Sequence, residues 1–181
     1  MFRIYEIEDY IKISPDKYGE DVNKIAEEIL REEYENKFFK DLGIVLLVYD
    51  IKINEMGMIM IGEGSTYHEA RFKILTFMPV VNEVVEGVVR DVRNIGLFVD
   101  IGPLDALVHI SQVMEDKAYY DEASGRIVSE DGRKFIEKGD IVRGRITSIS
   151  LPSGREGVMR IAMTLRQAGL GKIEKSEMRK R

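Results

Sequence analysis

The sequence predicts two small domains in series, a β-α-β-β-β unit in residues 1–79 and a five-stranded all-β barrel in residues 80–181. Its 181 residues suffice for one ordinary domain or for two small ones. One long helical periodicity lies in the first half, whereas five short strands separated by turn residues lie in the second. The expected fold class is therefore α+β followed by all-β.

Composition limits the functional classes. Apolar residues make up 44% and charged residues 33% of the chain, a balance typical of a folded, soluble protein. The chain has no Cys and only two His, His68 and His109, so we expect no thiolate or His-rich metal site and no cofactor. The longest apolar run, Ile44 to Tyr49, is far shorter than the roughly 20 residues that cross a bilayer. We therefore expect a cytoplasmic protein without a membrane contact.

The first predicted elements are a strand and a helix. Residues 2–13 alternate loosely between apolar and polar side chains and end at Ser14-Pro15-Asp16, which is typical of a helix start. From Val22 to Phe38 the apolar residues recur at the i, i+3, i+4, i+7 spacing of one helical face. We expect this helix to stop near Gly43.

Three strands complete the first half. Residues 44–53 are rich in Val, Ile and Tyr, residues 56–65 form a shorter β-prone run that closes with Gly62 and Gly64, and residues 67–78 alternate as a half-buried strand does. A phosphate-binding loop at Gly62-Glu63-Gly64 is disfavoured. The glutamate repels phosphate, no Lys-Ser/Thr pair follows, and no helix begins there.

The second half contains the five barrel strands. They are expected at residues 84–92, 94–102, 104–111, 141–150 and 158–165. Five strands with short turns suit a small closed barrel of the oligonucleotide-binding (OB) type, and Gly96 would let a strand bend at a barrel corner. Residues 114–135 exceed what a bare barrel needs, so we expect an added hairpin there.

Two features of the barrel suggest contact with nucleic acid. If Phe98 and His109 both point outward from neighbouring strands, they form a platform on which unstacked bases can lie. The alternative, in which Phe98 belongs to the core and His109 is a buried, hydrogen-bonded residue, is left open by the periodicity. Residues 138–166 also carry a local excess of cations over Asp140 and Glu156, which suits a basic face or an ordinary solvated strand: Lys138, Arg143, Arg145, Arg155, Arg160 and Arg166.

The barrel strings resemble those of a known RNA-binding family. The strings are Gly96-Leu97-Phe98-Val99-Asp100-Ile101, Ala106-Leu107-Val108-His109-Ile110-Ser111, Lys138-Gly139-Asp140 and Ile161-Ala162-Met163-Thr164-Leu165. Over about 80 residues they resemble the ribosomal-protein-S-one type of barrel. This resemblance implies base stacking on Phe98 and His109 and a basic contact from Arg160. A second aromatic of the family is Ile95 here, which implies weaker stacking.

The whole chain is similar to the archaeal RNA polymerase stalk subunits of the E-prime family, counterparts of the seventh-largest subunit of eukaryotic polymerase II. The further support is the Ser-Pro helix start, Gly102-Pro103-Leu104-Asp105, and the ending Met163-Thr164-Leu165-Arg166-Gln167. The resemblance implies an N-terminal tip domain that docks on the polymerase core through Gly62, Glu63 and Gly64. It also implies a heterodimer with the helical F-type RNA polymerase subunit, bracing of the polymerase clamp, and contact with nascent single-stranded RNA. The predicted RNA-binding set is Phe98, His109, Lys138, Arg143, Arg145 and Arg160.

No catalytic constellation is visible in the sequence. It contains no Ser-His-Asp order, no paired His and no Cys nucleophile, so we expect no independent enzymatic activity.

Two alternative functions use the same barrel. A translation factor would carry the barrel first in the chain rather than second, and an exosome accessory protein would pair it with a catalytic or trimerising domain. For the contact with the F-type subunit, residues Phe77, Met78, Val80 and Val81 are candidates, although an interdomain core explains them equally well.

Overall fold

The structure, a computed structural model, describes residues 1–152, 154–155 and 157–173. The chain divides into two compact units. The first contains residues 1–78 and the described part of segment 153–157, and the second contains residues 79–152 and 158–173. Each unit has its own core and is described by itself. The functional division into a docking domain at 1–79 and an RNA-binding domain at 80–181 stays a prediction.

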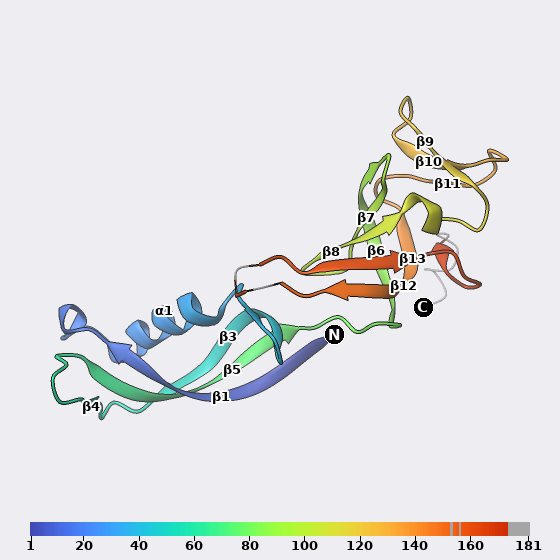
Figure 1. Cartoon of the computed structure of the whole chain (residues 1–181). Coiled ribbons are helices and arrows are strands. Elements are labelled where there is room, and N and C mark those ends of the chain that lie inside the picture. The colour runs from blue at the N-terminus through green and yellow to red at the C-terminus, as the bar shows by residue number, and fades with distance from the viewer. Residues whose placement is uncertain (153, 156, 174–181) are drawn as a thin grey trace. The chain divides into compact units, whose positions relative to one another are not determined.

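The first unit is an antiparallel sheet with one helix, α1 (Val22–Tyr34), across one face (Figure 1). The helix begins at Asp21, whose carboxylate accepts a hydrogen bond from the backbone N–H of Asn23. Its buried face packs on the sheet and forms the core of the unit. The strand order is β1 (Phe2–Ile13), β5 (Thr66–Phe77), β3 (Gly43–Ile53) and β2 (Phe38–Phe39), with β4 (Met58–Ile59) paired to the start of β5.

The helix ends earlier than its periodicity predicts. It stops at Tyr34 rather than near Gly43, and the Ser14-Pro15 signal starts only a short 3-10 turn (Pro15–Lys17). Asn36 has a φ of 60°, a left-handed conformation that asparagine tolerates and that a helix cannot contain. Its N–H donates to the carbonyl of Val45 at 2.8 Å, which turns the chain into β2. Phe38 is therefore buried from a strand and not from the helix.

The second unit contains a closed five-stranded barrel, so the predicted fold class is confirmed. The strands follow the order β13-β8-β7-β6-β12, and β12 also pairs with β13 to close the ring. Only β13 and β8 are parallel among these neighbouring pairs. The strands are β6 (Val84–Arg93), β7 (Gly96–Asp100), β8 (Asp105–His109), β12 (Ile141–Ser150) and β13 (Arg160–Thr164). A two-residue strand, β14 (Gly171–Lys172), lies beside β12.

Gly96 is required at the start of β7. Its φ is 144°, and a Cβ at this position would lie 2.0 Å from the carbonyl oxygen of Val108. A side chain here would force β7 and β8 apart. The strands pair in register beyond this point, with Phe98 opposite Leu107 and Gly96 opposite His109.

The segment between β8 and β12 forms more than the expected hairpin. After the 3-10 turn η2 (Ile110–Gln112), three short antiparallel strands build a separate small sheet: β9 (Ala118–Asp121), β10 (Arg126–Ser129) and β11 (Phe135–Ile136). Ile127 and Ile136 are buried and pair across this sheet. The sequence does not reveal β11, because a two-residue strand carries no periodicity to detect.

Candidate nucleic-acid interface

Phe98 and His109 lie on the same outward face of the barrel. Leu97, Val99, Ala106 and Val108 alternate with them and are buried in the barrel core. Because Gly96 pairs with His109, Phe98 is the diagonal neighbour of His109 across the two strands. His109 is exposed and Phe98 is half-buried. The structure therefore contradicts the alternative in which Phe98 belongs to the core and His109 is buried.

Arg93 completes this face, although no sequence pattern singles it out. Its guanidinium carbon lies 5.0 Å from the centre of the Phe98 ring, within range of a cation–π interaction. Its Nε also donates to Asp91 Oδ2 at 2.7 Å. A bulge between Val89 and Asp91 shifts the register of β6 and turns both side chains toward Phe98. Simple alternation along β6 could not locate this bulge.

The bulged part of β6 also lies next to the turn that carries Lys138. Gly139 donates to the carbonyl of Val89 at 2.8 Å, so the turn before β12 lies against the bulged part of β6. The hydrogen bond from Arg93 holds the pKa of Asp91 below its ordinary value, and the charge of Lys138 lowers that pKa further. The face therefore combines the rings of Phe98 and His109 with two cations and one carboxylate.

The imidazole of His109 is oriented by the turn that follows it. The backbone N–H of Ser111 donates to Nδ1 at 3.3 Å, and the Ser111 hydroxyl lies 2.9 Å from the same nitrogen. A neutral ring that accepts at Nδ1 carries its proton on Nε2. At the same edge, Ile110 donates to the carbonyl of Ile95 at 2.9 Å, and the Ile95 side chain is half exposed. We call Arg93, Ile95, Phe98, His109 and Lys138 the platform.

The other predicted cations lie elsewhere on the barrel. Arg143 is on β12 and is paired with Glu86 of β6 at 2.8 Å, which offsets much of its charge locally. Arg145 is half-buried on the same strand, and among the described residues no hydrogen-bond partner is found for its Nε. Arg160 is exposed at the start of β13, level with the Asp105 end of β8 rather than with His109. The structure thus groups Lys138 with Phe98 and His109 but leaves Arg143, Arg145 and Arg160 apart.

In the first unit, Glu63 braces the predicted docking tip from within. Its carboxylate accepts hydrogen bonds from Tyr67 at 2.6 Å and from Lys12 at 3.0 Å. These two bonds, that from Tyr67 first, lower the pKa of Glu63. Tyr18 donates to the carbonyl of Gly64 at 2.7 Å, and Gly62 turns the chain with a φ of 91°. Gly62, Glu63 and Gly64 therefore shape the tip.

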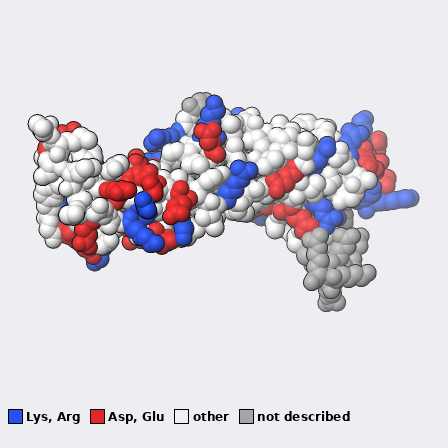
Figure 2. Space-filling model, turned by 90° about the horizontal axis from the view of Figure 1, so that it is seen from below, with Lys and Arg blue, Asp and Glu red and all other residues white. Residues whose placement is uncertain are grey.

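The surface of this tip is apolar. Met56 is 84% exposed, Ile59 is 70% exposed and Ile61 is fully exposed, and Met58 and Met60 are exposed beside them. Figure 2 shows the end of the first unit near β4 largely free of charged side chains. We call residues Met56 and Met58 to Ile61 the apolar tip. The run is visible in the sequence as a β-prone strand, but alternation cannot show that both of its faces are exposed.

A second apolar surface lies on the sheet face opposite α1. Phe2 and Ile4 of β1 are exposed there, and Leu47 of β3 is 44% exposed. Phe77, by contrast, is fully buried, with its ring 5.1 Å from that of Phe2. Phe77 is therefore not the exposed candidate for a partner contact that one of the two sequence interpretations made it, because the register of β1 with β5 covers it with Phe2. Val80 and Val81 remain half exposed.

The described residues contain neither a membrane-spanning helix nor a cluster of metal ligands. No helix in the described ranges is long and apolar enough to span a bilayer. Among the residues that the structure describes, no three His, Asp or Glu side chains gather in a way that could hold a metal ion.

Comparison with known proteins relates both units to transcription. Residues 8–64 match the SHS2 domain found in the N terminus of Rpb7p/Rpc25p/MJ0397, and residues 79–133 match the S1 RNA binding domain. The chain is 46% identical over 175 residues to DNA-directed RNA polymerase subunit Rpo7 of Saccharolobus shibatae, covering 96% of each chain. It is 44% identical to the Rpo7 of Sulfolobus acidocaldarius, covering 96% of this chain and 94% of the relative. A more distant relative, DNA-directed RNA polymerase III subunit RPC8 of Saccharomyces cerevisiae, is 26% identical over 81% of this chain and 71% of its own length.

Proposed function

The chain belongs to the Rpo7 family of DNA-directed RNA polymerase subunits, and from this premise we propose that it is a non-catalytic stalk subunit that binds nascent single-stranded RNA. The observation that carries the RNA-binding role is the platform, where Phe98 and His109 share one outward face beside two cations. Unstacked bases lie on aromatic rings and phosphates pair with basic side chains. The Nε2–H of His109 is suited to donate to a phosphate or a base carbonyl.

The platform is tested by removing its two rings. Phe98→Ala combined with His109→Ala should weaken single-stranded RNA binding roughly 10- to 100-fold, since one stacked base contributes about 1 to 3 kcal/mol. Fluorescence anisotropy with a labelled oligonucleotide measures the loss. The matched control is Tyr119→Ala, an exposed ring of β9 outside the platform. Equal affinity of the double variant and the unaltered chain would refute the platform as the RNA site.

Docking on the polymerase core is assigned to the apolar tip. Five exposed apolar side chains on a glycine-shaped turn are typical of a surface that becomes buried against another protein. Gly62, Glu63 and Gly64 hold this turn through the bonds to Tyr67, Lys12 and Tyr18. Docked in this way, the chain would brace the clamp during promoter opening. An assay of open-complex formation with and without the chain tests this role.

The heterodimer with the F-type polymerase subunit is assigned to the uncovered sheet face. Phe2, Ile4 and Leu47 expose apolar surface on the face that α1 does not cover. A helical partner can bury such a face. Ile4→Glu places a charge in the centre of this surface and should prevent co-purification of the F-type subunit. The control Glu8→Gln alters a residue of the same strand face away from the apolar end. Retention of this partner by the Ile4 variant would place the interface elsewhere.

A further inference from the structure

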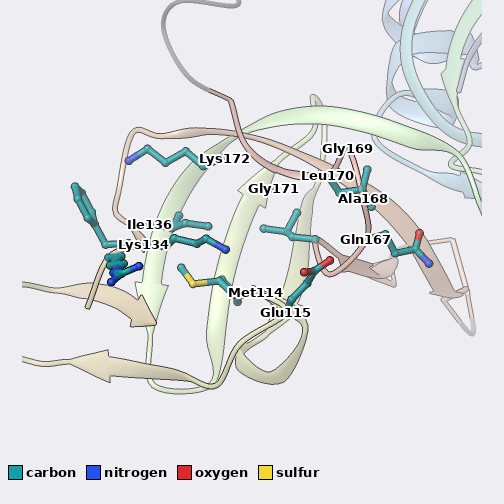
Figure 3. Close-up of a pocket in the computed structure, with 14 residues that line it drawn as sticks. Met114, Glu115, Lys134, Ile136, Gln167, Ala168, Gly169, Leu170, Gly171 and Lys172 are labelled. Atoms are coloured by element: carbon teal, nitrogen blue, oxygen red, sulfur yellow. The ribbon is translucent and has the colours of Figure 1, made fainter. Parts of the chain in front are cut away.

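An open groove of about 590 Å³ lies in the second unit, between the inserted sheet and the C-terminal strap (Figure 3). We use the term C-terminal strap for residues 165–172, which run from the end of β13 to β14. The apolar part of the lining consists of Met114, Ile136, Leu165 and Leu170. Figure 3 shows Met114 and Ile136 on one wall and the strap on the other. None of these residues belongs to the platform.

The rim of the groove is basic. Arg133, Lys134 and Lys172 line it together with one carboxylate, Glu115, and Lys172 also pairs with Asp140 at 2.6 Å. The ion pairs of Arg133 with Asp131 and of Lys134 with Asp116 are long, at 3.9 and 3.6 Å, and both cations are well exposed. Such exposed pairs contribute little, so Arg133 and Lys134 can exchange a carboxylate for a phosphate at small cost.

An aromatic ring accompanies these cations. The Nζ of Lys172 lies 4.4 Å from the centre of the Phe135 ring, and the guanidinium carbon of Arg126 lies 5.1 Å from it. The same combination of ring and cation occurs on the platform with Phe98 and Arg93. An apolar lining with a basic rim matches the two parts of a nucleotide, its base and its phosphate.

The groove is connected to the platform by a short path. His109 contacts Ser111, whose carbonyl accepts a hydrogen bond from Arg166 at 3.5 Å. Arg166 directly precedes Gln167, the next lining residue of the groove. On the other side, η2 leads from His109 to Met114. Arg166 therefore adds a cation on this path between the platform and the groove.

We propose that this groove is a second nucleotide-binding subsite, occupied by a nucleotide of the same single-stranded RNA that lies on the platform. The proposal rests on the RNA-binding function proposed above. The base packs on the apolar part of the lining, and Arg133, Lys134 and Lys172 contact the adjacent phosphates. Short oligonucleotides then fill only the platform, whereas longer ones reach both sites and bind more tightly.

The test compares oligonucleotides of about 5 and about 12 nucleotides, lengths within the range that single OB folds bind. In the full chain, Arg133→Gln, Lys134→Gln and Lys172→Gln together should weaken binding of the 12-mer about tenfold and leave the 5-mer unchanged. Each lost phosphate contact reduces the slope of log K against log salt by about 0.7, so the 12-mer slope should become shallower by about 2. The control variant Lys24→Gln, Lys40→Gln and Lys52→Gln removes the same charge from exposed positions of the first unit and should alter neither oligonucleotide.

A single substitution that should strengthen 12-mer binding, and not weaken it, adds a second measurement. Glu115→Gln removes the carboxylate of the lining and should strengthen 12-mer binding about twofold, because a carboxylate near the phosphates repels them. A structural defect would weaken binding instead. Loss of 12-mer affinity in this variant would count against the subsite.

Several outcomes overturn the proposal. If the unaltered chain binds both lengths equally, the groove is not used, yet the platform function stands. If it binds neither, both proposals fail. If deletion of residues 174–181 removes the advantage of the 12-mer while the groove variant retains it, the tail binds the RNA. If the groove variant loses a polymerase subunit but no RNA affinity, the groove is a protein interface.

Discussion

The apolar tip and the platform, the two surfaces proposed for recognition, are both exposed, but they are built from opposite chemistry. The tip presents Met and Ile side chains on a turn braced by the ionised Glu63, whereas the platform presents the rings of Phe98 and His109 beside charged side chains. Burial of apolar area is nearly independent of salt, whereas phosphate contacts weaken steeply as salt rises. The first chemistry suits a lasting protein contact and the second an RNA that must be released.

The largest expected difference between the two surfaces is the loss of folding stability when a glycine beside each surface is replaced. Gly96→Ala should lower the free energy of unfolding by about 3 to 4 kcal/mol, because its Cβ would meet the carbonyl of Val108. Gly62→Ala shares the positive φ but has open space around it, so its cost should be near 1 kcal/mol. Chemical denaturation measures both. Equal losses would show that the platform is no more tightly built than the tip.

Docking should depend on the tip and not on the platform. Ile61→Asp leaves the free chain folded, because this side chain is fully exposed, but it should weaken binding to the polymerase core about 100-fold. Surface-immobilised core enzyme provides the measurement. Tyr119→Asp, in the inserted sheet, is the control and should dock normally. Comparable loss in the control would remove the distinction between the surfaces.

Salt dependence should separate the platform from the tip. Arg93→Gln removes the cation over Phe98 and should weaken RNA binding about three- to fivefold, with a salt slope shallower by about 0.7. Core docking of the same variant should not change. Isothermal titrations at several salt concentrations test this. An unchanged slope would mean that Arg93 only covers the ring and contacts no phosphate.

The smallest expected effect concerns the pH response of the tip. The pKa of Glu63 is lowered by its bonds from Tyr67 and Lys12, so the ionised form stabilises the tip. This contribution is present above the ordinary glutamate pKa of 4.5 and is lost as pH falls through the lower folded-state pKa. Tyr67→Phe should raise the Glu63 pKa toward 4.5 and lower the unfolding midpoint slightly at pH 7, where the contribution of the ionised form is present. A carbon-detected NMR titration of Glu63 follows the shift, and an unaltered pKa would contradict it.

Prediction from the sequence succeeded where a periodic pattern reported local structure. The alternation in β7 and β8 placed Phe98 and His109 on neighbouring strands. The charge count over residues 138–166, by contrast, grouped cations that lie apart in the structure, because Arg143 pairs with Glu86 and Arg160 lies at the start of β13. Prediction also failed where a single residue changed the path of the chain. Asn36 ended the helix before Phe38, and the bulge in β6 turned Arg93 toward Phe98. Neither the turn at Asn36 nor the bulge in β6 alters the spacing of apolar residues, so hydrophobic periodicity cannot reveal them.

By itself, the sequence determined the order of the two units, the α+β and barrel classes, and the strands that carry the candidate stacking residues. These follow from periodicity and turn residues, which act over a few positions along the chain. Only the tertiary structure decided which cations gather around Phe98, which apolar residues form the exposed tip, and that Phe77 is buried by Phe2. Strand register and bulges set these contacts between residues distant in sequence, and register depends on the packing of the whole sheet.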